Sequence, residues 1–75
     1  MKKEVYRREY AVEIRKKLDN ESTKFLEQVD VFYSVEDAET CKKEYNEPLS
    51  NNEFIDIICI EYDANDNEIG FYSIY

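Results

Sequence analysis

The segment of this chain that most constrains its fold is residues 53–62, Glu-Phe-Ile-Asp-Ile-Ile-Cys-Ile-Glu-Tyr. Successive side chains of a strand point to opposite faces of its sheet, and this segment is apolar on both faces. One face would carry Phe54, Ile58, Ile60 and Tyr62, and the other Ile55, Ile57 and Cys59. Such a strand is typical of the centre of a sheet that is covered on both sides. The sequence therefore predicts a central strand with two apolar surfaces to cover.

Two earlier segments alternate apolar and charged side chains, as half-buried strands do. Residues 5–18 and residues 23–33 both show this pattern, and the turn-forming residues 19–22 separate them, so we expect an antiparallel hairpin. A helix is an open alternative for the first segment, because four of its apolar residues recur at every fourth position. Val12 interrupts that helical stripe, which favours the strand. Residues 68–75 predict the last strand of the chain.

A single helix is predicted between the two hairpins. Ser34 can cap it by accepting a hydrogen bond from the backbone N–H of Asp37. Acidic residues follow in the first turn and basic residues later, an order that suits the helix dipole. The buried stripe of the helix would consist of Ala38, Cys41 and Tyr45. We expect the helix to end at Asn46, because Pro48 prevents its continuation.

The order of these elements predicts a single α+β domain over residues 1–75 with the topology ββαββ, in which one helix covers one face of a four-stranded antiparallel sheet. One helix cannot cover both apolar faces of the last two strands, so we expect a homodimer that buries the second face. The sequence leaves open which face the helix takes. The face that we assign to the dimer interface consists of Ile55, Ile57, Cys59, Tyr72 and Ile74.

Few groups in this sequence could carry out chemistry. It has no histidine, and therefore neither a His-based triad nor a His metal ligand. Its one glycine, Gly70, excludes a glycine-rich phosphate loop. We predict a non-enzymatic protein with no catalytic residues, no metal and no cofactor, and an enzyme is the least favoured hypothesis.

The same features indicate where the protein works. Met1-Lys2-Lys3 is followed at once by Glu4, which is unlike a secretory signal, and no apolar run is long enough to span a membrane. Cys41 and Cys59 lie within apolar patterns without CxxC spacing, and we expect two buried reduced thiols. We therefore expect a soluble, cytoplasmic protein that does not bind membranes.

The segment after residue 62 partly matches a calcium-binding loop. The first three ligand positions are occupied by Asp63, Asn65 and Asn67. Glu68 then stands where the loop needs glycine, and Ile74 stands where it needs a bidentate glutamate. A plain hairpin turn is the favoured interpretation.

The charge of the chain is unevenly distributed. Residues 1–24 carry eight bases and five acids, a net charge of +3, and residues 25–75 carry two bases and thirteen acids, a net charge of −11, which gives −8 for the whole chain. Such a surface attracts a basic partner and repels phosphate backbones, so we expect no direct nucleic-acid binding. The carboxylates that we predict to bind the partner are Glu36, Asp37, Glu39, Glu44, Glu47, Glu53, Glu61, Asp63, Asp66 and Glu68.

A dense array of carboxylates on a folded scaffold can imitate the charge of DNA. In its size, its composition and its acidic run from Glu44 to Glu68, the chain resembles the small acidic proteins that bacteriophages make to take over host machinery. That resemblance implies an inhibitor, acting in the host bacterial cytoplasm, that competes with DNA for a basic host DNA-binding protein. A nucleoid-associated protein of the HU type is the leading candidate partner. The bases Lys2, Lys3, Arg7 and Arg8 depart from a uniformly acidic mimic.

The alternative function is a small adaptor or structural module that binds a protein partner through an apolar face or a strand edge. Binding through carboxylates should weaken as the salt concentration rises, whereas binding through an apolar face should persist. The sequence alone does not decide between these two modes.

Overall fold

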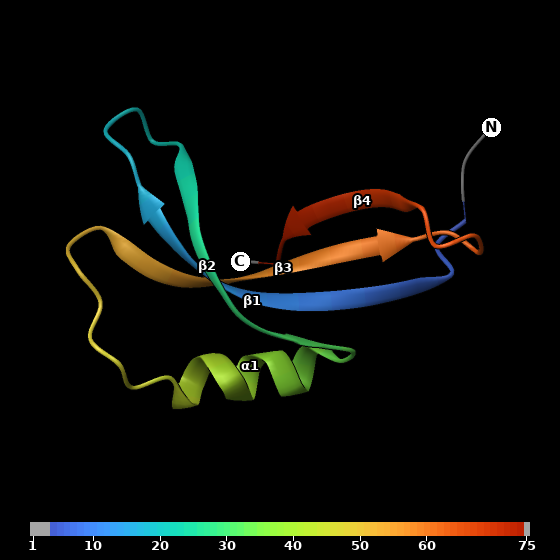
Figure 1. Ribbon diagram of the computed structural model, residues 1–75, viewed down its shortest axis with the longest axis horizontal. Helices are drawn as coiled ribbons and strands as arrows, with labels where there is room; N and C mark the ends of the chain where they lie inside the picture. Colours follow the sequence, from blue (N-terminus) through green and yellow to red (C-terminus); the bar gives the residue numbers. More distant parts are fainter. Residues whose placement is uncertain (1–3, 75) are drawn as a thin grey trace.

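The computed structural model describes residues 4–74. Within them lie the elements β1 (Arg7–Lys17), β2 (Thr23–Phe32), α1 (Val35–Glu44), β3 (Glu53–Tyr62) and β4 (Glu68–Ser73). The strands form one antiparallel sheet in the order β2-β1-β3-β4, and α1 lies against one face of it (Figure 1). The predicted ββαββ topology is confirmed, and so is the central position of the strand at residues 53–62.

The two central strands, β1 and β3, are joined in a long register. Val12 pairs with Ile57 at the middle of that register. Because β2 and β3 both run antiparallel to β1, they are parallel to each other, and α1 connects them by crossing over β1. The crossover places α1 against β1, β2 and β3, while β4 extends the sheet beyond the helix.

A small core joins α1 to the face of the sheet that it covers, which we call the helix face. Val12, Ile57 and Ala38 are fully buried in one cluster. Around them pack the partly buried side chains of Tyr10, Val29, Phe32, Cys41, Ile55 and Ile74. Complete burial of a side chain such as Ile57 contributes about 1.5–3 kcal/mol, so this cluster holds the helix in place.

The opposite face of the sheet, which we call the open face, is covered by no helix within residues 4–74. Ala11 and Ile58 pair across β1 and β3 on this face, and both are buried among the side chains of a twisted sheet. Phe71 on β4 pairs with Ile60 and is 62% exposed. The open face therefore has a closed centre, with exposed apolar side chains toward both edges, Phe71 on β4 and Phe25 on β2.

The start of α1 is as predicted, and its end differs slightly. The hydroxyl of Ser34 accepts a hydrogen bond from the backbone N–H of Asp37 at 3.2 Å. The C-cap is Tyr45 instead of Asn46, because the N–H of Tyr45 donates to the carbonyl of Lys42 at 3.4 Å and the chain then becomes extended. The predicted helix is therefore confirmed, with its end one residue earlier.

The last strand is shorter than the predicted residues 68–75, and Tyr75 lies outside the described residues. The N–H of Ile74 still donates to the carbonyl of Ile57 at 3.1 Å. Where the pairing with β4 ends, the carboxylate of Asp56 accepts hydrogen bonds from the N–H of Ile57 at 2.9 Å and from the hydroxyl of Ser73 at 2.8 Å. Asp56 thus satisfies polar groups at the end of the ladder, which explains why this acid is buried.

Candidate functional site

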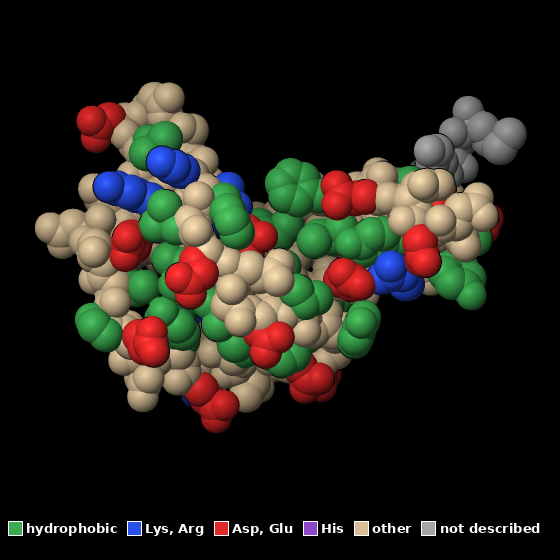
Figure 2. Space-filling model, in the orientation of Figure 1, with side chains coloured by type: hydrophobic (Ala, Val, Ile, Leu, Met, Phe, Trp, Pro, Cys, Tyr) green, Lys and Arg blue, Asp and Glu red, His purple; other side chains and the backbone are tan. Residues whose placement is uncertain are grey.

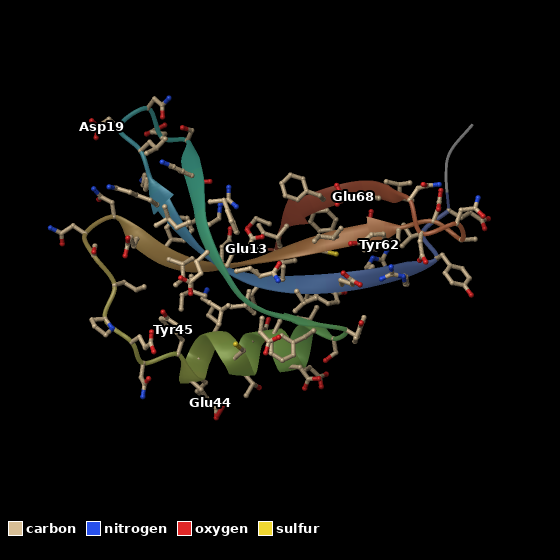
Figure 3. The ribbon with its side chains drawn as sticks, in the orientation of Figure 1. Glu13, Asp19, Glu44, Tyr45, Tyr62 and Glu68 are labelled. Atoms are coloured by element: carbon tan, nitrogen blue, oxygen red, sulfur yellow. The ribbon has the colours of Figure 1, made fainter. Side chains whose placement is uncertain are left out.

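Nine of the ten carboxylates predicted to bind a partner lie in two separate regions, and Glu53 lies in neither. The helix group lies on α1 and the loop after it and consists of Glu36, Asp37, Glu39, Glu44 and Glu47. The hairpin group lies where β3 turns into β4 and consists of Glu61, Asp63, Asp66 and Glu68. Figure 3 shows Glu44 beside α1 and Glu68 on β4, on opposite sides of the sheet. Glu53, at the start of β3, accepts a hydrogen bond from the N–H of Ser50 at 2.7 Å and holds the preceding loop.

Arginines of β1 neutralise part of the hairpin group. The Nε of Arg8 donates to the Oε2 of Glu61 at 2.9 Å, and the Nε of Arg7 donates to the Oδ1 of Asp66 at 3.0 Å. The hydrogen bond to Glu61 raises the pKa of Arg8 above its ordinary value. Glu61 and Asp66, which we predicted to bind a partner, therefore form ion pairs within the molecule.

Asp63 and Gly70 shape the hairpin around these pairs. The Oδ1 of Asp63 accepts hydrogen bonds from the N–H groups of Asn65 and Asn67, both at 2.9 Å, so this carboxylate holds the turn that the sequence predicted. Gly70 lies opposite Glu61, and a Cβ atom at Gly70 would be 2.8 Å from the Oε1 of Glu61. The glycine therefore leaves the space in which Glu61 meets its arginine.

The acids of β1 on the open face are paired in the same way. Arg7 donates to Glu9, which also accepts a hydrogen bond from the hydroxyl of Tyr62 at 3.2 Å. The guanidinium carbon of Arg7 lies 4.0 Å from the centroid of the Tyr62 ring, a cation–π contact. Arg15 donates to the Oε1 of Glu13 at 2.8 Å. The arginines of β1 therefore neutralise their own strand as well as the neighbouring hairpin.

None of the ion pairs described within residues 4–74 involves the helix group. Its five carboxylates are exposed, and every ion pair described within residues 4–74 joins an arginine of β1 to an acid of β1 or of the β3–β4 hairpin. Lys42 and Lys43 supply positive charge in the last turn of α1, where they suit the helix dipole. The negative charge of the helix group is therefore presented to solvent.

Two further acids join this region from β2 and were missed in the sequence. Glu27 and Asp30 are exposed on the strand that lies next to α1. Their place on an edge strand would have indicated that they belong to this surface. Recognising it requires the strand order β2-β1-β3-β4, which the sequence does not reveal. We define the acidic surface as Glu27, Asp30, Glu36, Asp37, Glu39, Glu44 and Glu47.

Besides burial, acids of β2 and acids of the helix group both raise the pKa values of Tyr45 and Cys41. Burial raises the pKa of Tyr45, and the charges of Glu47 and Glu27 raise it further. Burial likewise raises the pKa of Cys41, with further contributions from Asp30 and from Glu44 of α1. Carboxylates of β2 and of the C-terminal end of the helix group therefore act on the same two side chains.

The tip of the β1–β2 hairpin has the opposite character. Lys16, Lys17 and Lys24 are exposed there. Figure 2 shows basic side chains at the upper left, with a carboxylate at the tip itself, whereas carboxylates follow the lower side of the molecule, where α1 lies. Lys16, Lys17 and Lys24 thus lie apart from the acidic surface (Figure 1).

The side chains assigned to a dimer interface lie on the helix face, and this assignment needs correction. Ile57 is fully buried against Ala38, and Cys59 is 1% exposed. The partly buried side chains of Ile55 and Ile74 pack around the same core, and Tyr72 alone is exposed. The helix occupies this face because its own apolar stripe needs the core. A surface for a second copy would have to be sought on the open face.

Other kinds of site find little support in the described residues. No group of three or more Cys, Asp and Glu side chains within residues 4–74 is arranged to hold a metal ion. The same part of the chain has no helix of the length and apolar character that a membrane crossing needs. No protein-family model, no curated protein and no solved structure matches the chain.

Proposed function

We propose that the protein binds a basic DNA-binding protein through its acidic surface and inhibits it by competing with DNA. The observation that supports this proposal is the contrast between acids paired with arginines of β1 and acids of α1 and β2 that face solvent. Carboxylates on a helix and an adjacent strand retain their negative potential and attract a basic groove. A host nucleoid protein of the HU type remains the leading candidate, in the bacterial cytoplasm.

The test is displacement of DNA. A purified HU-type protein is bound to a fluorescent DNA duplex, and the chain is added while the fluorescence anisotropy is followed. We expect displacement at about 50 mM salt and little displacement at about 300 mM, because the attraction is screened. If the duplex stays bound at the lower salt concentration, the chain does not act on this class of protein by competition.

A matched pair of variants locates the surface. The first replaces four acids of the helix group: Glu36→Gln, Glu39→Gln, Glu44→Gln and Glu47→Gln. The control removes the same charge elsewhere: Glu4→Gln, Asp19→Asn, Glu21→Gln and Glu68→Gln. Exposed pairs contribute about 0.2–1 kcal/mol each, so the first variant should compete about 10–100-fold less well. Equal loss in both variants would mean that net charge alone is responsible.

The open face favours a second candidate function, that of an adaptor or self-associating module. Phe71 is 62% exposed there, beside Ile60 on β3. Such binding should persist in about half-molar salt, because it depends on apolar contact. Phe71→Asp should then abolish binding or a concentration-dependent dimer, measured by analytical ultracentrifugation, and an unchanged result would exclude this face.

A further inference from the structure

A groove of about 410 Å³ lies between β2 and the C-terminal end of α1. Val29, Cys41 and Tyr45 contribute its apolar and aromatic lining. Three carboxylates line it as well, those of Glu27 on β2, Glu44 on α1 and Glu47 in the loop after α1. Figure 3 shows Glu44 and Tyr45 at this end of the helix. The groove therefore combines an aromatic ring, an aliphatic wall and concentrated negative charge.

Negative charge is concentrated around the groove. The pKa values of Tyr45 and Cys41 are both raised, first by burial and then by the surrounding carboxylates. No ion pair described within residues 4–74 involves Glu27, Glu44 or Glu47. The hydroxyl of Tyr45 lies 3.5 Å from Glu47, which holds the ring beside that carboxylate.

We propose that this groove receives one arginine side chain of the basic partner, and this inference rests on the proposed function for the identity of that partner. The aliphatic stem of arginine would lie along Val29 and Cys41, because long basic side chains cover apolar surface while their charged ends remain polar. The planar guanidinium group would stack on Tyr45 and donate to the carboxylates at the rim. Lysine fits less well, because its compact ammonium neither stacks nor forms a planar fork.

The probe for this test is n-propylguanidinium, which carries the head and stem of arginine, with n-butylammonium for comparison. Each is titrated into isotope-labelled protein while the NMR shifts are followed. We expect saturable shifts at Val29, Cys41, Tyr45 and Asn46, and binding about 5-fold tighter for the guanidinium. Shifts spread over all the carboxylates, without saturation and equal for both probes, would overturn the proposal.

Variants of equal charge sharpen the result. Glu44→Gln with Glu47→Gln removes two charges from the groove, and Glu36→Gln with Glu39→Gln removes two from α1 outside it. The first pair should weaken n-propylguanidinium binding about 5-fold or more, and the second less than about 2-fold. Tyr45→Leu should also weaken the guanidinium while hardly affecting the ammonium. Equal effects of both pairs would show that no groove is involved.

The two proposals can fail separately. Saturable probe binding without displacement of DNA would reject the HU-type partner and leave the groove intact. Suppose instead that the chain displaces DNA, that both variant pairs weaken this displacement equally, and that the probe does not bind at the groove. That result would support the proposed function and reject the arginine groove.

Discussion

The hairpin group and the acidic surface contain the same kind of side chain in opposite situations. At the hairpin, Glu61 and Asp66 each meet an arginine of β1 that is more than fifty positions away in the sequence. On α1 and β2, the acids are exposed to solvent. The comparison teaches that net charge does not locate a binding surface, because the fold decides which charges are neutralised internally. Among the described residues, Arg7 and Arg8 pair with acids of the β3–β4 hairpin, and no described ion pair reaches the acids of α1.

The largest effect is expected where the acidic surface depends on the core. The helix group and β2 stay together only while α1 packs on the sheet, and Ile57 is fully buried in that contact. Ile57→Ala should lower the free energy of unfolding by about 2–5 kcal/mol in a urea titration. Phe71→Ala, at an exposed position, should change it little, and comparable losses would mean that the open face is packed.

Removal of an arginine should destabilise the hairpin end. Arg7 contacts Glu9, Asp66 and the ring of Tyr62. Arg7→Ala should lower the midpoint of thermal unfolding by about 5 °C, because several surface interactions are lost together. Lys43→Ala, which removes a base from α1, should leave the midpoint nearly unchanged when followed by circular dichroism.

Replacing an acid by its amide should change the midpoint of thermal unfolding in opposite directions in the two regions. Glu61→Gln loses the pair with Arg8 and should lower the melting midpoint by about 3 °C. Glu44→Gln with Glu47→Gln relieves repulsion between like charges and should raise it by about 1 °C. Both shifts should shrink in about 1 M salt. A loss of stability in the second variant would show that those acids also have internal partners.

The elements and their ββαββ topology could be predicted from the sequence, and the face that the helix covers and the strand order could not. The strand at residues 53–62 and the cap at Ser34 depend on side-chain alternation and a neighbouring N–H, and both are confirmed. The helix face could not be chosen, because β3 is apolar on both sides. Register shifts in the β1–β2 pair, at Val12/Glu13 and Ile14/Arg15, interrupt a simple alternation.

The candidate site was predictable to a similar extent. The helix group follows from the composition of one helix. The neutralisation of Glu61 and Asp66, and the contribution of Glu27 and Asp30, depend on which strands become neighbours. A single sequence does not contain that information, since several strand orders satisfy the same alternation.

The smallest expected effect is on the pKa values of two tyrosines, one in each region. Burial raises the pKa of both Tyr45 and Tyr62, but Arg7 opposes the rise at Tyr62. Arg7→Ala should therefore raise the pKa of Tyr62 further, whereas Glu47→Gln should lower that of Tyr45, as ultraviolet titration of tyrosinate would show. Unchanged titration curves would contradict these assignments.

The same shifts give the sign of the alkaline pH dependence. Both tyrosines have a higher pKa in the folded state than the value of about 10 expected in the unfolded chain. Their contribution to stability is therefore complete below pH about 10 and is lost as the pH rises through the raised values.

Gly70 lies beside one of the ion pairs that distinguish the hairpin group from the acidic surface. The Oε1 of Glu61 lies where a β-carbon at position 70 of β4 would be only 2.8 Å away, and its Oε2 accepts a hydrogen bond from Arg8. A β-carbon there would require the Glu61 carboxylate to shift, although no charged residue had been altered. A single added carbon atom at position 70 would therefore act on the Arg8–Glu61 pair, one of the contacts that distinguish the hairpin group from the acidic surface.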